Sequence, residues 1–163
     1  MTDKARMVLE DCKGALSDFK DGLQGAEWRR HWMLCVILLR VVGHVLDKVD
    51  GKANPQLGKI VDGEYERLKK SKPNPSIFWE FIDQERNNLI KLYETSAGQG
   101  VTTKMGAVGT SELPETEYHY FINSGPFQGR DQRDMIREAI SWWENHLNNI
   151  GKKLKQGGTQ QMY

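Results

Sequence analysis

The chain has no marked excess of charge of either sign and no long apolar run. Lysine and arginine together number 23 against 22 aspartate and glutamate residues, a formal net charge of +1. The net charge of the chain is too small to attract nucleic acid, so any phosphate-binding site must be a local cluster of basic residues. The longest apolar run, Trp32 to Leu39, covers eight residues, whereas crossing a bilayer takes about twenty. We therefore expect no membrane-spanning helix.

Cysteine is scarce as well. Cys12 and Cys35 stand alone, no CxxC motif is present, and the four histidines lack metal-ligand spacing. We expect two buried, unreactive thiols in a reducing compartment, no metal site and no other cofactor. The first residues carry no apolar stretch of the signal-peptide type, which predicts a cytoplasmic protein.

Periodic apolar residues predict a mainly α-helical protein. Three- and four-residue steps indicate a first helix that ends near Gly22, and residues 26–49 are apolar on nearly every side, as in a central helix. Asn54-Pro55 and Asn74-Pro75 each place a good N-cap before a proline suited to the first turn. We predict an up-and-down bundle of about five helices.

A short β-hairpin is predicted before the last helix. Apolar and polar residues alternate over 101–107, and residues 117–122 are aromatic and β-prone. We expect one helical domain over residues 1–156, with the hairpin near 101–123, and a flexible tail over 157–163. The last helix begins near Asp131 and carries a heptad stripe, formed by Ile136, Ile140, Trp143, Leu147, Ile150 and Leu154.

Adjacent tryptophans in that last helix suggest a contact surface. Trp142 and Trp143 point about 100° apart around the helix axis, so both cannot enter one core. We expect one of them to cover the hairpin or a second subunit, which predicts a homodimer.

The most informative segment is a polar block, residues 83–88, inside an apolar helix. At helical spacing Arg86 lies on one stripe with five apolar or aromatic residues, Trp79, Ile82, Leu89, Ile90 and Tyr93. A guanidinium at such a core position must find a carboxylate, a partner chain or a ligand phosphate, because an unpaired buried charge is too costly.

The sequence of this block resembles the RNxxxH signature of the HEPN (higher eukaryote and prokaryote nucleotide-binding) superfamily. Arg86 and Asn87 match the first two positions, Lys91 stands in place of the histidine, and Tyr93 matches a tyrosine of some HEPN groups. The likeness covers about eight residues. It implies a small helical bundle that binds RNA or a nucleotide. Many members of the superfamily are metal-independent ribonucleases of defence or toxin–antitoxin systems, with an active site shared across a dimer.

The lysine at position 91 alters the chemistry that the resemblance implies. Metal-free RNA cleavage needs a group that exchanges a proton near neutral pH, as histidine does. A lysine begins near a pKa of about 10.4. Arg86 and Lys91 would hold a phosphate through charge-assisted hydrogen bonds, so the resemblance favours binding over catalysis. The alternative is that Glu85 and Arg86 join structural salt bridges at a helix crossing.

Two further clusters are candidate parts of a site. Arg40 and His44 share one face of the central helix. They would need an anion if they faced Arg86 and Lys91, but would be neutralised if they faced Glu80, Asp83 or Glu85. The turn at 125–133, with Arg130, is either an anion cradle at a helix N-terminus or a capped turn. The rival to nucleotide binding is a non-enzymatic module whose surface recognises a protein partner.

Overall fold

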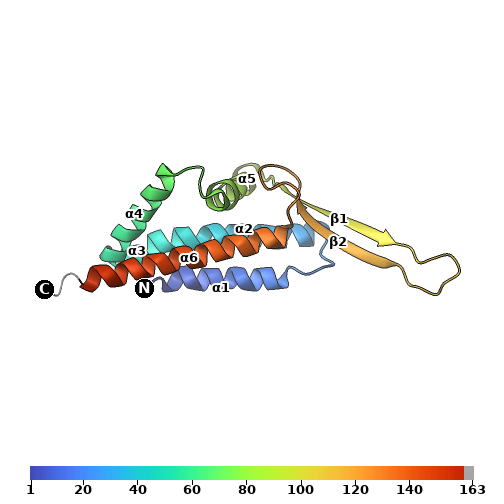
Figure 1. The fold of residues 1–163 in the computed structure, drawn as a ribbon, viewed down its shortest axis with the longest axis horizontal. Coiled ribbons are helices and arrows are strands. Elements are labelled where there is room, and N and C mark those ends of the chain that lie inside the picture. Colours follow the sequence, from blue (N-terminus) through green and yellow to red (C-terminus); the bar gives the residue numbers. More distant parts are fainter. Residues whose placement is uncertain (160–163) are drawn as a thin grey trace.

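The computed structural model describes residues 1–159, which form a helical bundle and a projecting β-hairpin (Figure 1). Three long helices lie side by side: α1 (Asp3–Asp18), α2 (Gly25–Val45) and α6 (Gln132–Thr159). α2 continues into a π-helical segment, η1 (Leu46–Asp50), and a final turn, α3 (Gly51–Ala53).

A second layer covers one side of these helices. It consists of α4 (Pro55–Lys70), a π-helical segment η2 (Ile77–Asp83) and α5 (Gln84–Leu92), which continues η2. Counting each continuous rod once gives α1, α2–α3, α4, η2–α5 and α6. The prediction of a mainly helical bundle of about five helices, with a hairpin before the last one, is confirmed.

The predicted heptad stripe of α6 forms the centre of the core. Its six members are all buried, at 6% exposure or less. The α2 helix contributes Trp32, Cys35, Val36 and Leu39 to the same core. The two cysteines are free and buried, and burial raises the pKa of each thiol to about 12. As predicted from their apolar surroundings, both thiols are protonated at neutral pH.

Two of the three predicted helix starts are confirmed by their capping bonds. The Asn54 side chain accepts hydrogen bonds from the backbone N–H groups of Gln56 and Leu57, at 3.0 and 3.1 Å. Asp131 Oδ1 accepts from the N–H groups of Arg133 and Asp134 and so caps α6. Near Asn74 the helix starts as predicted, since the Pro75 carbonyl accepts from the N–H groups of Phe78 and Trp79. The predicted side-chain cap is not formed within the described residues.

Several predicted boundaries shift. The helix that opens near Pro75 was predicted to run to about Ser96, but it ends at Leu92, because Tyr93 adopts a left-handed conformation with φ of 55°. The hairpin begins earlier than predicted, with β1 (Ala97–Lys104) antiparallel to β2 (Glu115–Ile122) in a register that pairs Ala97 with Ile122. Helix α6 includes residues 157–159 of the predicted tail, and residues 160–163 lie outside the described part.

The tryptophan pair of α6 packs inside the bundle. Trp143 is buried, and the half-buried Trp142 ring stacks on His146 with a centroid distance of 4.9 Å and an interplanar angle of 13°. Trp142 also lies 4.9 Å from the Phe78 ring. Trp142 therefore covers η2 rather than the hairpin, and the pair supplies no argument for a second subunit.

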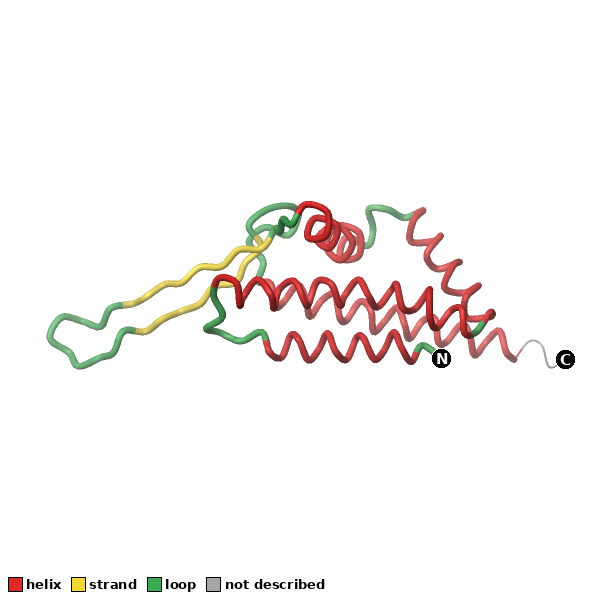
Figure 2. Tube along the Cα trace, turned by 180° about the vertical axis from the view of Figure 1, so that it is seen from behind, coloured by secondary structure: helices red, strands yellow, loops and turns green. Residues whose placement is uncertain are grey.

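The hairpin extends well beyond the ends of the helices, as the opposite views in Figures 1 and 2 both show. Within residues 1–159, no helix combines the length and the apolar character needed to cross a membrane.

Candidate functional site

The polar block is buried at Glu85 rather than at Arg86. Glu85 is 3% exposed, Arg86 is half-buried, and Ile90 and Tyr93 on the predicted stripe are 61% and 68% exposed. The segment before the block is π-helical, and its i→i+5 bonding accommodates about one extra residue per turn. Trp79, Ile82 and Leu89 of the predicted stripe are buried, but between Ile82 and Leu89 it is Glu85 that enters the core. The prediction of a core position for Arg86 was therefore wrong by one residue.

The buried carboxylate of Glu85 has a structural role. It accepts hydrogen bonds from the Thr95 hydroxyl at 2.5 Å, the Ser96 N–H at 2.9 Å and the Ser96 hydroxyl at 2.8 Å. The Trp32 indole N–H in turn donates to the Thr95 hydroxyl at 2.8 Å. Glu85 thereby fixes the turn between α5 and β1 against the central helix.

Arg86 belongs to a different set of polar contacts, which links α2 to η2 and α5. Arg40 Nε lies 3.3 Å from Asp83 Oδ1, and the Asn87 amide donates to Asp83 Oδ2 at 3.3 Å. Arg86 Nη1 donates to Asn87 Oδ1 at 2.8 Å. We call these four residues the polar chain. It brings together Arg40, Asn87 and Arg86, three of the residues singled out from the sequence.

The polar chain neutralises Arg40 but not Arg86. Arg40 faces Asp83, as in the second of the two arrangements considered for it. Among residues 1–159 Arg86 makes no ion pair, and its hydrogen-bond acceptor is the neutral Asn87 amide. The Arg86 guanidinium therefore retains an uncompensated, partly accessible positive charge.

A cavity of about 250 Å³ lies beside Arg40, between α2, α4, η2 and α6. Arg40 and His44 contribute to its wall, as do the side chains of Tyr65, Phe78, Trp143 and His146. Of the charged groups at its edge, Lys48 pairs with Asp47 at 2.7 Å. The site thus joins a strongly aromatic cavity to the arginine-containing polar chain through Arg40.

Gly43 allows the Trp143 ring to form this wall. A Cβ atom at position 43 would lie only 2.8 Å from Trp143 Cη2, so a larger residue would displace the indole. The indole N–H of Trp143 is buried and has no hydrogen-bond partner among residues 1–159. Buried polar groups are nearly always paired, so an unpaired donor on a residue of the cavity wall is exceptional in this core.

Three of the predicted site residues lie apart from this arrangement. Lys91 and Tyr93 are exposed near the end of α5, and neither lines the cavity. Arg86 and Lys91 are five positions apart, so their side chains leave the helix about 140° apart and do not converge on one anion within a chain. Arg130 pairs with Glu138 at 2.7 Å, which leaves a capped turn rather than an anion cradle at 125–133.

His146 is held neutral in the cavity wall. Burial lowers its pKa to about 4; the carboxylate of Glu64 opposes the shift, and the cations Arg67 and Lys153 add to it. At neutral pH this imidazole is therefore uncharged, and a pKa of about 4 makes it a weak base for proton transfer.

The depressed pKa of His146 predicts a loss of stability in mild acid. The unfolded chain binds a proton below a pKa of about 6.5 that the folded chain accepts only below about 4. Stability should therefore fall by about 2 kcal/mol, after allowance for partial exposure, between these two pH values. The variant His146→Phe, which keeps a ring against Trp142, should remove this part of the pH dependence in urea titrations. An unchanged slope between pH 6.5 and 4.5 would show that His146 is protonated in the folded protein.

Sequence reasoning missed most of the cavity. Tyr65, Phe78 and Trp143 come from three separate helices, and each fits an apolar stripe on its own. The sequence contained one signal for the cavity. Gly43, which lies between Arg40 and His44, has no side chain, whereas most residues of this helix are bulky.

No group of three or more potential metal ligands occurs among the described residues. Comparison with known proteins adds no relative: no protein-family model, curated protein or solved structure matches the chain.

Proposed function

We propose that the protein binds a nucleotide, free or as part of an RNA strand, at the polar chain and the adjoining cavity. The observation that carries the proposal is the continuity of the two features through Arg40. At one end of the site, the uncompensated charge of Arg86 suits the phosphate of a nucleotide. At the other end, the aromatic rings of the cavity suit its base.

Each residue has a distinct part in this proposal. Arg86 holds a phosphate by charge-assisted hydrogen bonds, and Asn87 fixes the direction of its guanidinium. Arg40 stands between the phosphate and the cavity, where His44 and the neutral His146 offer ring nitrogens to a base. A volume of about 250 Å³ lies just below the range of about 300–1,000 Å³ for ligand pockets, so the cavity suits the planar base rather than the whole nucleotide.

The proposal is one of binding rather than cleavage. Lys91, the residue in the histidine position of the HEPN-like motif, lies outside the cavity, and His146 is too weak a base. Neither residue supplies a proton shuttle within one chain. The short motif match with the HEPN superfamily agrees with nucleotide binding in a cytoplasmic protein.

The test is titration of the purified protein with AMP and with a fluorescein-labelled single-stranded RNA. Arg86→Ala should raise the dissociation constant about tenfold or more, the loss expected for one charge-assisted phosphate contact. Arg137→Ala is the matched control, because it removes the same charge from an exposed residue of α6 that pairs with Asp134. Equal effects of the two substitutions would show that Arg86 acts only through the net charge of the protein. Unchanged binding in Arg86→Ala would refute the proposal.

A second candidate function, recognition of another protein chain, is favoured by a separate observation. The hairpin carries exposed apolar residues at its tip, far from the polar chain.

A further inference from the structure

A second group of basic residues lies near the proposed site, at the end of α4. Four of the six residues at positions 67–72 are cations, namely Arg67, Lys69, Lys70 and Lys72. Arg67 and Lys69 pair with carboxylates of α4, each at 2.5 Å. Lys70 and Lys72 are exposed and make no ion pair among residues 1–159. The uncompensated charge of this segment is therefore concentrated at its end, where the chain passes from α4 toward η2.

The ammonium group of Lys72 is held against an aromatic ring beside the cavity. Its Nζ atom lies 4.7 Å from the centre of the Trp79 ring, a favourable position for a cation. The Trp79 ring in turn lies 6.2 Å from the ring of Tyr65, which belongs to the cavity wall. The Trp79 indole N–H donates to the Leu68 carbonyl at 3.2 Å, which fixes this ring between α4 and η2. Lys72 is therefore one ring away from the cavity wall.

The continuous helix of η2 and α5 sets the order of three cations along the site. Lys72 contacts this helix at Trp79. Arg40 pairs with Asp83, four residues further on, and Arg86 follows three residues later. Seven residues of helix rise about 10 Å. Arg40, which lines the cavity, thus lies between Lys72 and Arg86, the two cations that have no ion pair within the described chain.

A free mononucleotide would leave one of these two cations unused. It carries a single phosphate group, which the proposed site assigns to Arg86. In a polynucleotide, by contrast, every internal ribose has a phosphate on each side. Proteins that bind single strands combine cations that follow the backbone with aromatic rings on which bases stack. Unpaired cations on the two sides of an aromatic cavity therefore suit one nucleotide within a strand.

We propose that the site binds a single strand of RNA, in which the phosphates on the two sides of one ribose contact Arg86 and Lys72 and the base enters the cavity. The inference rests on the proposed function and adds to it a second phosphate-binding residue. Asp62, an acidic residue of the cavity wall, precedes Lys72 by ten residues, almost three turns of helix, and does not neutralise it.

The first test compares AMP with adenosine 3′,5′-bisphosphate, which carries a phosphate on each side of its ribose. The unmodified protein should bind the bisphosphate about tenfold more tightly, the gain from one further charge-assisted contact. Lys72→Ala should bring the two dissociation constants to within about twofold of each other, whereas Arg86→Ala should weaken the binding of both ligands. Lys72 is exposed, so its variant should unfold at the same temperature as the parent protein.

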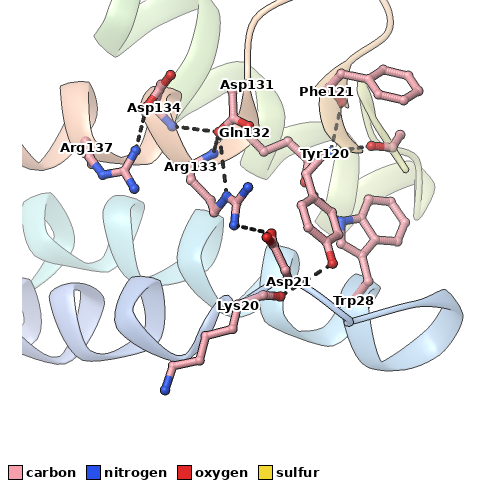
Figure 3. A network of polar contacts seen from close by, with 11 residues as sticks. Lys20, Asp21, Trp28, Tyr120, Phe121, Asp131, Gln132, Arg133, Asp134 and Arg137 are labelled. Atoms are coloured by element: carbon pink, nitrogen blue, oxygen red, sulfur yellow. Dashed lines mark hydrogen bonds and ion pairs between the residues drawn. The ribbon is translucent and has the colours of Figure 1, made fainter. Parts of the chain in front are cut away.

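Lys20→Ala is the matched control for this comparison. Lys20 is exposed and makes no ion pair in the described chain, and its ammonium group points away from the polar contacts around Gln132 at the root of the hairpin (Figure 3). This substitution should leave the preference for the bisphosphate intact. An equal loss of preference in Lys20→Ala and Lys72→Ala would show an effect of net charge alone and would overturn the inference.

The salt dependence of RNA binding tests for the strand itself. For single strands, the logarithm of the binding constant falls with the logarithm of salt concentration by about 0.7 per neutralised phosphate. With a fluorescein-labelled single-stranded RNA, Lys72→Ala and Arg86→Ala should each reduce this slope by about that amount, and Lys20→Ala should leave it unchanged. A slope that Lys72→Ala does not alter would contradict the second phosphate contact.

The two small ligands also separate this inference from the proposed function. If the parent protein bound AMP but bound the bisphosphate no more tightly, the nucleotide site would stand and the role of Lys72 would be wrong. If the parent protein bound neither ligand, both proposals would fail.

Discussion

Glu85→Ala is expected to lower the free energy of unfolding by about 4 kcal/mol. The carboxylate is 3% exposed, and its loss leaves the Ser96 N–H, the Ser96 hydroxyl and the Thr95 hydroxyl without their acceptor. An unsatisfied buried donor costs about 1–3 kcal/mol, and the turn into β1 loses its fixed position. Urea unfolding followed by tryptophan fluorescence measures the change.

Two companion variants make this prediction specific. Glu85→Gln keeps the shape and one acceptor oxygen, so it should cost clearly less than alanine. Arg86→Ala, one residue along, should cost less than about 1 kcal/mol, because the half-buried guanidinium makes no ion pair within the described chain. If Arg86→Ala destabilised the protein more than Glu85→Ala, the assignment of the buried charge to Glu85 would be wrong.

Gln132→Leu is expected to cost about 3 kcal/mol, although leucine is similar in size and apolar. The substitution leaves the Trp28 indole N–H and the carbonyls of Gly98 and Phe121 without their partner at the hairpin root. Thermal or urea unfolding gives the total. Hydrogen exchange should locate the damage, with faster exchange at residues 97–100 and 120–122 than in the centre of α6.

The control for this prediction is Gln84→Leu. Gln84 is exposed on α5, and within the described part of the chain its side chain donates to Asn88 alone. The same chemical change should therefore alter stability by less than about 0.5 kcal/mol. Equal losses in the two variants would show that the hairpin root does not depend on Gln132.

The parts of the fold that could be predicted from the sequence are those encoded locally. The heptad stripe of α6 needs only its own spacing, and Asn54-Pro55 and Asp131 carry their own capping chemistry. The hairpin follows from alternation and aromatic residues. The π-helical geometry of η2, in which five of seven residues are buried, has no such local signal. The choice between Glu85 and Arg86 had none either, because both lie at helical spacing from Ile82 and Leu89, and the contacts of Glu85 with Thr95 and Ser96 decide it.

The candidate site was only partly predictable for a related reason. Arg40 and His44 stood out because they interrupt an apolar helix, and Asp83 was among the partners considered for them. The cavity depends on Tyr65, Phe78, Trp143 and His146, which come together from α4, η2 and α6. The sequence of one segment alone does not reveal such a meeting. The position of Trp142 was unpredictable for the same reason, because its ring packs on Phe78, which is distant in the sequence, as well as on His146.

The unbroken course of α6 has a consequence for geometry. The helix begins at Gln132, in the hairpin root, and carries Trp143 and His146 of the cavity wall, about 16 and 21 Å further along its axis. The base of the hairpin and the wall of the cavity are thus connected by one continuous helix. The direction in which the hairpin leaves the bundle at Gln132 (Figure 3) is therefore rigidly coupled to the direction in which the cavity opens.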